Sequence, residues 1–433
     1  MKNLLKTVCY YIFLIPATLF AQENWVGCSQ KIPIKTYEGH RFRLQAAVRA
    51  EIEDDSAWTG IFLRADKQGG FGFFDNMQDR PIRNRSWKTY MIEGTIDTNA
   101  YQLVFGIVCV YNGKFFLDDV KLEIETTKGS WQTMFSTDFE NNSNNFVQSV
   151  QRVDRGFNTL YKAEIVSGQA ATGDKCLVIK GEKVPNYGVN NKVGKYADVN
   201  GIKLYYEIYG EGQPLVVMHG NGGSIEDAST HYPELIKKYK VIAIDSRGQG
   251  RSNDTDKPLT YDLMASDVKL LLDQLGIDSV YIWGQSDGAI LGLLLAMDYP
   301  KKVKKVLAFG ANIQPDSNAL FSWAINSDAK KIKTETNEKK RKLLVLMRDY
   351  PNIPFSKLGQ IKAQVLIMAG DRDVICPEHT LKLFQHIPNA HMCIIPGATH
   401  GASWEKQALF MQLLNDFFEK PFEMPTTEDW YKE

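Results

Sequence analysis

The stretch Val280-Tyr281-Ile282-Trp283-Gly284-Gln285-Ser286-Asp287-Gly288-Ala289-Ile290-Leu291-Gly292 decides the fold of the larger part of this chain. An apolar run rich in β-forming residues reaches Gly284, and an apolar helical pattern follows Ser286. A serine on a sharp strand-to-helix turn takes a strained conformation, and only small flanking residues avoid a clash with the neighbouring strand and helix. Gly-x-Ser-x-Gly alone also occurs by chance, so the surrounding sequence must support a nucleophile here.

Strands alternate with helices from Tyr196 onward, which predicts an α/β sheet with helices on both sides. Thr260 opens an amphipathic helix that Gly276 ends, and residues 405–418 form a closing helix. Between Gly310 and Gln360 the chain leaves the sheet, with a helix predicted at 337–350. Continuous apolar runs, typical of strands buried on both faces of a parallel sheet, lie at residues 215–218, 241–244, 303–309, 365–368 and 392–395.

Length and charge limit the function classes. A chain of 433 residues is long enough for two or three domains. Lys plus Arg and Asp plus Glu both number 51, so no net charge attracts nucleic acid, and no nucleic-acid partner is expected.

The first residues have the order of a secretory signal. A basic start, an apolar run from Val8 to Phe20 and a small residue at Ala21 predict a signal peptide over 1–21 and an exported, periplasmic or secreted protein. The run is short for a stable membrane span, and a retained N-terminal anchor is the alternative.

Five cysteines remain after the signal, and no pair has metal-ligand spacing. Neither a metal nor an organic cofactor is expected. Most of the thiols are expected to be buried small hydrophobes, and Cys28 with Cys109 is the first pair to test for a disulfide.

Residues 22–128 alternate with period two, which predicts half-buried strands and an antiparallel β-sandwich. Turn residues separate the strands at 54–56, 68–70 and 112–113, and Asn112-Gly113 between two apolar runs predicts a hairpin. The alternation is clearest at Phe42, Leu44, Ala46 and Val48, and again at Val120, Leu122 and Ile124.

This region resembles the jelly-roll modules of the carbohydrate-binding, galactose-binding-like type. The resemblance lies in Ser86-Trp87-Lys88-Thr89-Tyr90, in the strand from Tyr101 to Tyr111 and in the closing segment 116–122. It implies a glycan partner, and Trp58, Trp87 and Tyr90 are the candidates for stacking on a sugar, with Phe71, Phe73 and Phe74 beside them. Packing in the core or in loops is the alternative role of these rings.

Residues 129–184 are predicted to be a second, partial β unit packed on its neighbours, since too little chain is present for a full sandwich. Residues 185–195 are rich in Asn and Gly and are the predicted linker. The second domain then covers 196–420, and 421–433 is a C-terminal tail.

Two late loops can activate Ser286. A serine hydroxyl is a poor nucleophile at neutral pH, so it needs a base, and the base needs a carboxylate to fix its tautomer. Asp371 and Asp373 follow the strand at 365–368, and His400 follows the last strand. Because the carboxyl ends of parallel strands meet at one edge of a sheet, these residues are expected to converge on Ser286.

Acyl transfer also requires backbone N–H groups directed at the developing oxyanion. The glycine-rich segment His219-Gly220-Asn221-Gly222-Gly223 follows the strand at 215–218, and the N–H groups of Asn221 and Asp287 are the predicted donors. His219 is expected to brace this loop. The side chain of Asp287 has no assigned role.

Residues 196–420 resemble an α/β-hydrolase fold protein. The resemblance rests on His219-Gly220-Asn221, the turn Asp245-Ser246-Arg247-Gly248-Gln249-Gly250-Arg251-Ser252, the Ser286 elbow, the acidic loop and His400, in the order Ser, Asp, His. It implies a structural role for the 245–252 turn, and it implies Asp373 as the acid, with Asp371 as the alternative. Haloalkane dehalogenases and epoxide hydrolases resemble the same frame but attack with an aspartate, whereas the attacking position here is Ser286.

The resemblance also implies that residues 311–360 form a cap that sets substrate choice. Its lysines suggest either an anionic substrate or a solvated face, and the solvated face is favoured. The sequence therefore predicts an exported serine esterase that cleaves a small-molecule ester, thioester or lactone. The alternatives are an acyltransferase, a carbon–carbon bond hydrolase with the same triad, and a non-catalytic glycan-binding protein on a hydrolase frame.

Overall fold

The computed structural model describes residues 25–34, 36–141, 150–152 and 160–431, which divide into two compact units, Met1–Asn186 and Tyr187–Glu433. The predicted signal at 1–21 and Phe146 lie outside the described residues. Within those ranges, no helix has both the length and the apolar character needed to cross a membrane. Export stays a prediction.

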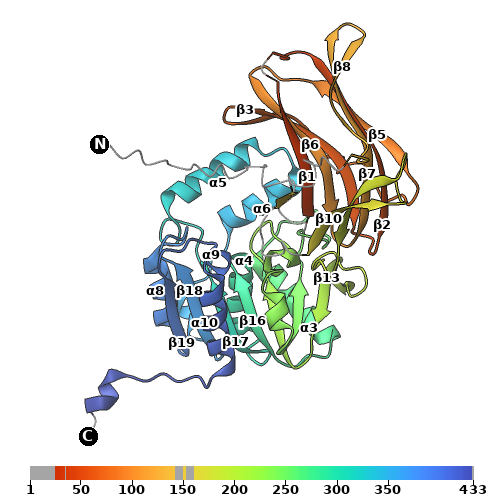
Figure 1. The fold of residues 1–433 in the computed structure, drawn as a ribbon. Helices are drawn as coiled ribbons and strands as arrows, with labels where there is room; N and C mark the ends of the chain where they lie inside the picture. Colours follow the sequence, from red (N-terminus) through yellow and green to blue (C-terminus); the bar gives the residue numbers. More distant parts are fainter. Residues whose placement is uncertain (1–24, 35, 142–149, 153–159, 432–433) are drawn as a thin grey trace, which may run out of the picture. The chain divides into compact units, whose positions relative to one another are not determined.

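The first unit consists of two antiparallel sheets, which confirms the predicted β-sandwich (Figure 1). One sheet has the order β4-β3-β6-β1-β9 and the other the order β10-β11-β7-β2-β5, with β8 beside β7. Phe42, Leu44, Ala46 and Val48 on β2 are at most 1% exposed, as their alternation predicts. The strands are β1 (Trp25–Pro33), β2 (Arg41–Ile52), β3 (Trp58–Lys67), β4 (Gly70–Asp75), β5 (Lys88–Thr95), β6 (Ala100–Val110), β7 (Gly113–Thr127), β8 (Ser130–Thr137), β9 (Val150–Arg152), β10 (Tyr161–Ser167) and β11 (Lys175–Gly181).

The turn at Asn112-Gly113 is a crossover between the sheets, and the predicted hairpin is wrong. β6 pairs with β1 and β3, whereas β7 pairs with β2, β8 and β11. Both flanking strands are apolar because each contributes a face to the same core. Turn residues indicate where a chain reverses, but they do not indicate which sheet receives the next strand.

Residues 129–184 do not form a β unit of their own. β8 and β11 pair with β7, β10 pairs with β11, and β9 pairs with β1, so all four strands extend the two sheets already present. A segment this short cannot bury a separate core, and edge strands of an existing sandwich offer it unsatisfied hydrogen-bonding groups.

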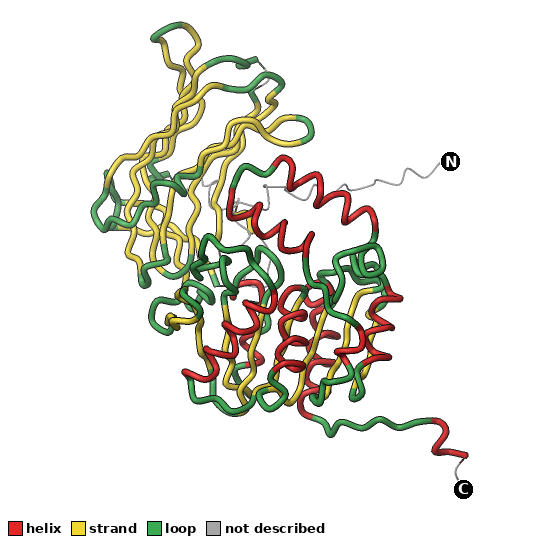
Figure 2. The backbone as a smooth tube through the Cα atoms, turned by 180° about the vertical axis from the view of Figure 1, so that it is seen from behind, coloured by secondary structure: helices red, strands yellow, loops and turns green. Residues whose placement is uncertain are grey.

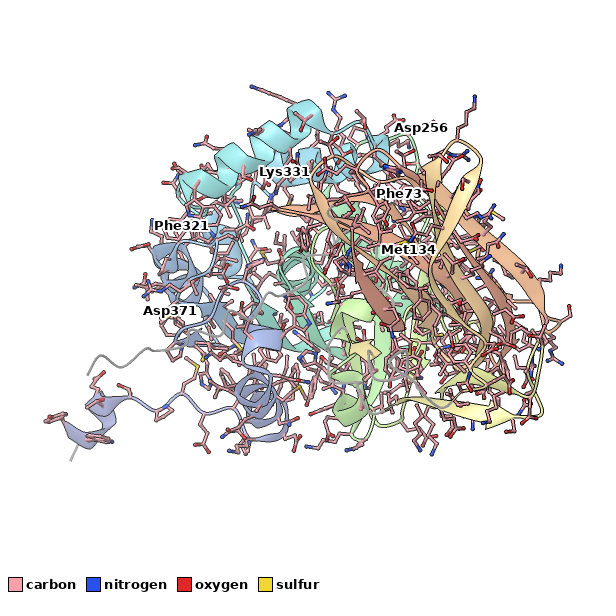
Figure 3. All side chains as sticks on the ribbon, turned by 45° about the horizontal axis from the view of Figure 1, so that its top comes forward. Phe73, Met134, Asp256, Phe321, Lys331 and Asp371 are labelled. Atoms are coloured by element: carbon pink, nitrogen blue, oxygen red, sulfur yellow. The ribbon has the colours of Figure 1, made fainter. Side chains whose placement is uncertain are left out.

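Trp58 is wrong as a candidate for sugar stacking, because it is only 3% exposed in the core of the sandwich. Phe73, labelled in Figure 3, packs edge-on against the core residue Phe42 with ring centroids 4.9 Å apart. Trp87 is half-buried and donates its indole N–H to the Gln169 carbonyl at 3.2 Å. Glycan binding through Trp87 and Tyr90 stays a prediction.

The cysteine pair predicted for testing is not a disulfide. All five cysteines within the described ranges are free thiols. Cys28 lies opposite Ile107 and Cys109 lies opposite Val26, so the two thiols are offset along neighbouring strands. Burial raises the pKa of the Cys28 thiol to about 12, so it behaves as a small core hydrophobe.

The predicted linker is largely held on the second unit. The Tyr187 ring packs against Tyr209 and Tyr232, with centroids 5.0 and 4.8 Å apart. The N–H groups of Gly188 and Asn190 donate to the buried Glu207 carboxylate at 2.7 and 2.9 Å. Residues 187–194 are therefore fixed to the second unit rather than free between the two.

The second unit is built on an eight-stranded sheet of order β12-β13-β15-β14-β16-β17-β18-β19. The first two strand pairings are antiparallel, and every pairing from β15 to β19 is parallel. Apolar residues fill both faces of the sheet, because helices cover both of them (Figure 2). The strands are β12 (Lys195–Val199), β13 (Ile202–Tyr209), β14 (Gln213–Met218), β15 (Tyr239–Ile244), β16 (Val280–Gln285), β17 (Val303–Phe309), β18 (Gln364–Gly370) and β19 (Ala390–Ile395).

The helices of this unit agree with the predicted pattern except in the cap. Thr260 caps α3 by accepting from the Leu263 N–H, and the predicted helix at 337–350 is α6. α5 was not predicted, because only Ile332 on it is buried and its apolar face is weak. The helices are η2 (Ile225–Ala228), α2 (Tyr232–Leu235), α3 (Tyr261–Gln274), α4 (Asp287–Asp298), α5 (Ser322–Thr334), α6 (Glu338–Asp349), α7 (Phe355–Leu358), α8 (Pro377–His386), α9 (Ala402–Glu405), α10 (Gln407–Glu419) and η3 (Thr427–Tyr431).

His379 on α8 anchors the segment that leads into the cap. It is fully buried, and its Nε2 accepts a hydrogen bond from the Ile313 N–H at 3.1 Å. Burial lowers the pKa of His379 from its ordinary 6.5 to about 4. The folded protein therefore holds this imidazole neutral, with the bond to Ile313 intact.

We expect His379 to make the protein sensitive to acid. Since its pKa is lowered on folding, its contribution is complete above pH 6.5 and is lost as the pH falls toward 4, at about 1.4 kcal/mol per pH unit. His379→Gln keeps an acceptor without a titrating group, so it should lose about 2 kcal/mol less between pH 6.5 and 5 than the native protein. Denaturant unfolding at each pH measures the difference. His386→Gln, at an exposed position of α8, is the control, and equal pH dependence in all three proteins would refute this role.

Candidate active site

Ser286 lies on a strained turn between β16 and α4. Its backbone has φ 53° and ψ −116°, a conformation that costs a non-glycine residue about 1–3 kcal/mol. A Cβ added at Gly284 would lie 2.1 Å from the Gly288 carbonyl oxygen, and one at Gly288 would lie 2.2 Å from that of Met218. Both flanking glycines are therefore required by close backbone packing, as the sequence predicts.

His400 and Asp373 are joined by a hydrogen bond. His400 Nδ1 lies 2.6 Å from Asp373 Oδ1, and the Asp373 side chain is fully buried while that of His400 is 29% exposed. Asp373 Oδ1 also accepts from the Ile375 N–H at 3.1 Å, which fixes the carboxylate. The ionised carboxylate accepts from Nδ1–H and leaves His400 Nε2 available as a proton acceptor.

Asp371 bonds to backbone N–H groups rather than to His400. One of its carboxylate oxygens accepts from the N–H groups of Gly397 and Ala398 at 2.8 and 3.3 Å, and these hydrogen bonds lower its pKa. Asp371 thus ties the acid loop to the loop that carries His400. Of the two aspartates, Asp373 is the one bonded to the imidazole.

Ser286 and His400 line one pocket of about 630 Å³, within the range of small-molecule sites. In this conformation, the two side chains make no direct hydrogen bond among the described residues. Such bonds are often long in the absence of substrate and tighten when substrate binds. The pocket is lined in part by apolar residues from the sheet, from η2, from the cap and from the acid loop, including Val217, Ile225, Trp283, Leu320, Ile325, Met347, Val374 and Ile375.

The N–H groups of the two predicted oxyanion donors have no acceptor among the described protein groups. Within the described chain, neither the Asn221 N–H nor the Asp287 N–H donates to a protein group. Asp287 is the first residue of α4, so its N–H has no intrahelical partner and carries the positive end of the helix dipole. Both residues line the pocket with Ser286.

Side chains on neighbouring elements hold the glycine-rich loop in place. Gln249 Oε1 accepts from the Gly222 N–H at 2.5 Å. His219 Nε2 accepts from the Ser246 N–H at 3.0 Å, and the His219 carbonyl accepts from the Gly288 N–H at 3.1 Å. His219 lines the pocket, but its bonds to Ser246 and Gly288 brace the loop, as predicted.

The turn at 245–252 is structural. Arg247 forms a bidentate pair with Asp267 at 2.7 Å, with both side chains 1% exposed. Asp245 accepts from the N–H groups of Ile225 and Arg251, each at 2.7 Å, and burial raises its pKa to about 6. Arg247 thus binds a side chain and Asp245 binds backbone N–H groups, and neither residue lines the pocket.

The cap helices α5 and α6 lie side by side (Figures 1 and 2). Residues of both helices, such as Trp323 and Met347, line the pocket. Figure 3 labels Phe321 at the start of α5 and Lys331 further along it. Lys331 lines the pocket but pairs with Asp328 at 2.9 Å, and Lys342 binds Asp254. The cap lysines are thus mostly solvated or paired.

Several residues at the site were not predicted. Gln285 donates to the His400 carbonyl at 3.2 Å and accepts from Ser403 Oγ at 2.9 Å. Gln249 holds the glycine-rich loop, and Tyr261 donates to the Asp287 carboxylate at 2.8 Å. Their partners are 26 to 118 residues away in sequence, so no local pattern reveals them.

Comparisons with known proteins identify relatives of the C-terminal unit. A family model described as alpha/beta hydrolase fold matches residues 213–331. The chain is 27% identical over 273 residues to "Serine hydrolase BPHL" from Mus musculus, covering 56% of this chain and 91% of that protein. It is 25% identical over 268 residues to "2-hydroxy-6-oxo-6-phenylhexa-2,4-dienoate hydrolase" from Burkholderia cepacia, covering 51% of this chain and 92% of that protein.

Among solved structures, an enol-lactonase from Burkholderia xenovorans LB400 is 22% identical, with a TM-score of 0.47, 52% of this chain covered and 100% of that chain. The parallel sheet, the elbow at Ser286 and the matched family model lie in the same part of the chain. The C-terminal unit of this protein has an α/β-hydrolase fold.

Proposed function

We propose that the C-terminal unit is a serine hydrolase that cleaves a carboxylic ester, thioester or lactone through an acyl-enzyme on Ser286. The observation that carries this proposal is the hydrogen bond of 2.6 Å between His400 and the buried Asp373, in a pocket shared with the strained Ser286. A base with a fixed tautomer and a serine hydroxyl in the same pocket are the two groups that nucleophilic catalysis requires.

The steps follow from the roles of these groups. His400 Nε2 takes the proton of Ser286 as Oγ attacks the acyl carbon, and the Asn221 and Asp287 amides stabilise the resulting oxyanion. The imidazolium then returns its proton to the leaving oxygen or sulfur, which breaks the acyl bond and leaves Ser286 acylated. Water, activated by His400, attacks the acyl-enzyme and releases the acid.

The pocket favours a substrate of moderate size with apolar substituents. Its volume of about 630 Å³ accommodates a small-molecule ester, and apolar side chains make up part of its lining. Carbon–carbon bond hydrolysis is the second candidate, because relatives of similar identity are named as dienoate hydrolases.

A substrate panel separates the two candidates. The purified protein would be incubated with p-nitrophenyl esters of graded acyl length, with aliphatic lactones, and with a 2-hydroxy-6-oxohexa-2,4-dienoate. We expect kcat/KM for the best ester or lactone to exceed that for the dienoate at least tenfold. Turnover of the dienoate alone would replace the ester assignment with carbon–carbon cleavage, and no turnover of either class would refute both.

A further inference from the structure

The carboxylate of Asp287 lies next to the nucleophile, yet the proposed chemistry uses only the backbone N–H of this residue. Asp287 is 2% exposed, and burial raises the pKa of its carboxyl. A buried carboxylate is costly unless hydrogen bonds satisfy it. Here Oδ1 accepts from the Tyr261 hydroxyl at 2.8 Å and Oδ2 accepts from Asn221 Nδ2 at 2.9 Å.

These bonds give the Asp287 side chain partners within the protein. Each carboxylate oxygen accepts a hydrogen bond from a protein donor, Oδ1 from Tyr261 and Oδ2 from Asn221. The acid that orients His400 is already supplied by Asp373. The Asp287 carboxylate is thus committed to protein groups on two other elements, the glycine-rich loop and α3.

Asn221 connects the Asp287 carboxylate to the cap. Its side-chain nitrogen donates both to Asp287 Oδ2 and, at 3.3 Å, to the Leu343 carbonyl on the cap helix α6. The backbone N–H groups of Asn221 and Asp287 are the two proposed oxyanion donors. The two residues that would hold the oxyanion are therefore bonded to one another through their side chains.

The separation of two such amides matters because each must lie about 2.7–3.1 Å from the oxyanion. A displacement of about 1 Å can reduce the rate by about 10²-fold. The other bonds of the loop hold its neighbours: the Gly222 N–H donates to Gln249, and the Gly288 N–H donates to the His219 carbonyl. The side-chain bond is the direct restraint between Asn221 and Asp287 themselves.

We infer that Asp287 is a positioning residue: its carboxylate, held by Tyr261, fixes Asn221 and thereby the separation of the two oxyanion amides. Asn221 Nδ2 also donates to the Leu343 carbonyl, which joins the cap helix α6 to the same pair. We call this set of bonds among Asp287, Asn221, Tyr261 and the Leu343 carbonyl the clamp. This inference rests on the proposed acyl-transfer function.

Side-chain substitutions test the clamp cleanly, because they leave both backbone amides in place. We expect Asn221→Ala and Asp287→Ala each to lower kcat on the best ester by about 10- to 100-fold, with KM changed less than about twofold. Affinity for an aryl boronic acid, which mimics the tetrahedral intermediate, should fall by a similar factor. The double variant should lose less than the product of the single losses, because both substitutions break one pair.

Asp298→Asn, at the exposed far end of the same helix, is the matched control and should retain native kcat and inhibitor affinity. Active sites are counted by labelling with a fluorophosphonate, so that rates refer to folded protein. Native kcat per labelled site in both alanine variants, or multiplicative losses in the double variant, would overturn the clamp. Failure of the native protein to label or turn over would instead refute the proposed function.

If the Asp287→Ala variant misfolds, Asn221→Ala still tests the clamp, because Asn221 is only half-buried and its substitution is less disruptive to the fold. A purely structural role of the Asp287 carboxylate would lower the unfolding midpoint and leave kcat and boronate affinity unchanged. The clamp predicts the opposite pattern for Asn221→Ala: a small change in stability and a clear fall in kcat.

Discussion

Ser286→Ala is expected to lower kcat on the best ester by roughly 10⁴- to 10⁶-fold while leaving the fold intact. Alanine removes the oxygen that becomes acylated, and the residual rate then comes from substrate binding and the oxyanion amides. The change is small in volume, and the Ser286 side chain makes no cap hydrogen bond to α4, so little stability depends on it. Steady-state kinetics with active enzyme and variant at equal concentration measures the loss.

Ser327→Ala is the control for this variant. Ser327 lies on the cap helix α5 and lines the same pocket, but it is far from the elbow in sequence and exposed. We expect its kcat to remain within about threefold of the native value. A Ser286→Ala variant that retained more than about a tenth of native kcat would show that another group attacks the substrate.

Asp373→Asn is expected to lower kcat by about 10⁴-fold. An asparagine amide can donate to His400 Nδ1, which favours the tautomer with its proton on Nε2, and that nitrogen can then no longer accept the proton of Ser286. The buried position and the bond from the Ile375 N–H keep the substituted side chain in place, so the loss reflects the tautomer rather than displacement. The pH dependence of kcat/KM reports the same change in the base.

Asp371→Asn is the matched comparison, because it is the same substitution two residues away. Asp371 binds the Gly397 and Ala398 amides and makes no bond to the imidazole. We expect less than a tenfold fall in kcat. Equal losses in the two variants, or a larger loss at Asp371, would reverse the assignment of the acid.

Much of the C-terminal fold could be predicted from the sequence, because its strands are continuous apolar runs with clear ends. β17 occupies residues 303–309 as predicted, and Thr260 caps α3. The sequence predicts that Asp371 or Asp373 bonds to His400, but it does not establish which of the two does so. Asp371 and Asp373 share a loop, and its folded path decides which carboxylate reaches the ring.

The errors arise where the outcome depends on partners distant in sequence. The turn at Asn112-Gly113 is recognisable locally, but the sheet that receives β7 is not. Tryptophan is a residue type that often stacks on sugars, but Trp58 lies on the face of its strand that packs into the core. The role of Asp287 depends on Asn221, 66 residues away, and on Tyr261, 26 residues away, so no pattern around Ser286 indicates it.

Covalent capture of the nucleophile tests the central claim most directly. The purified protein is treated with a fluorophosphonate, digested, and mapped by mass spectrometry. We predict one adduct per chain, on the peptide that contains Ser286, and its loss in Ser286→Ala with no change in Ser327→Ala. An adduct on another residue, or labelling that persists in Ser286→Ala, would contradict the assignment of Ser286 as the group that carries the acyl intermediate.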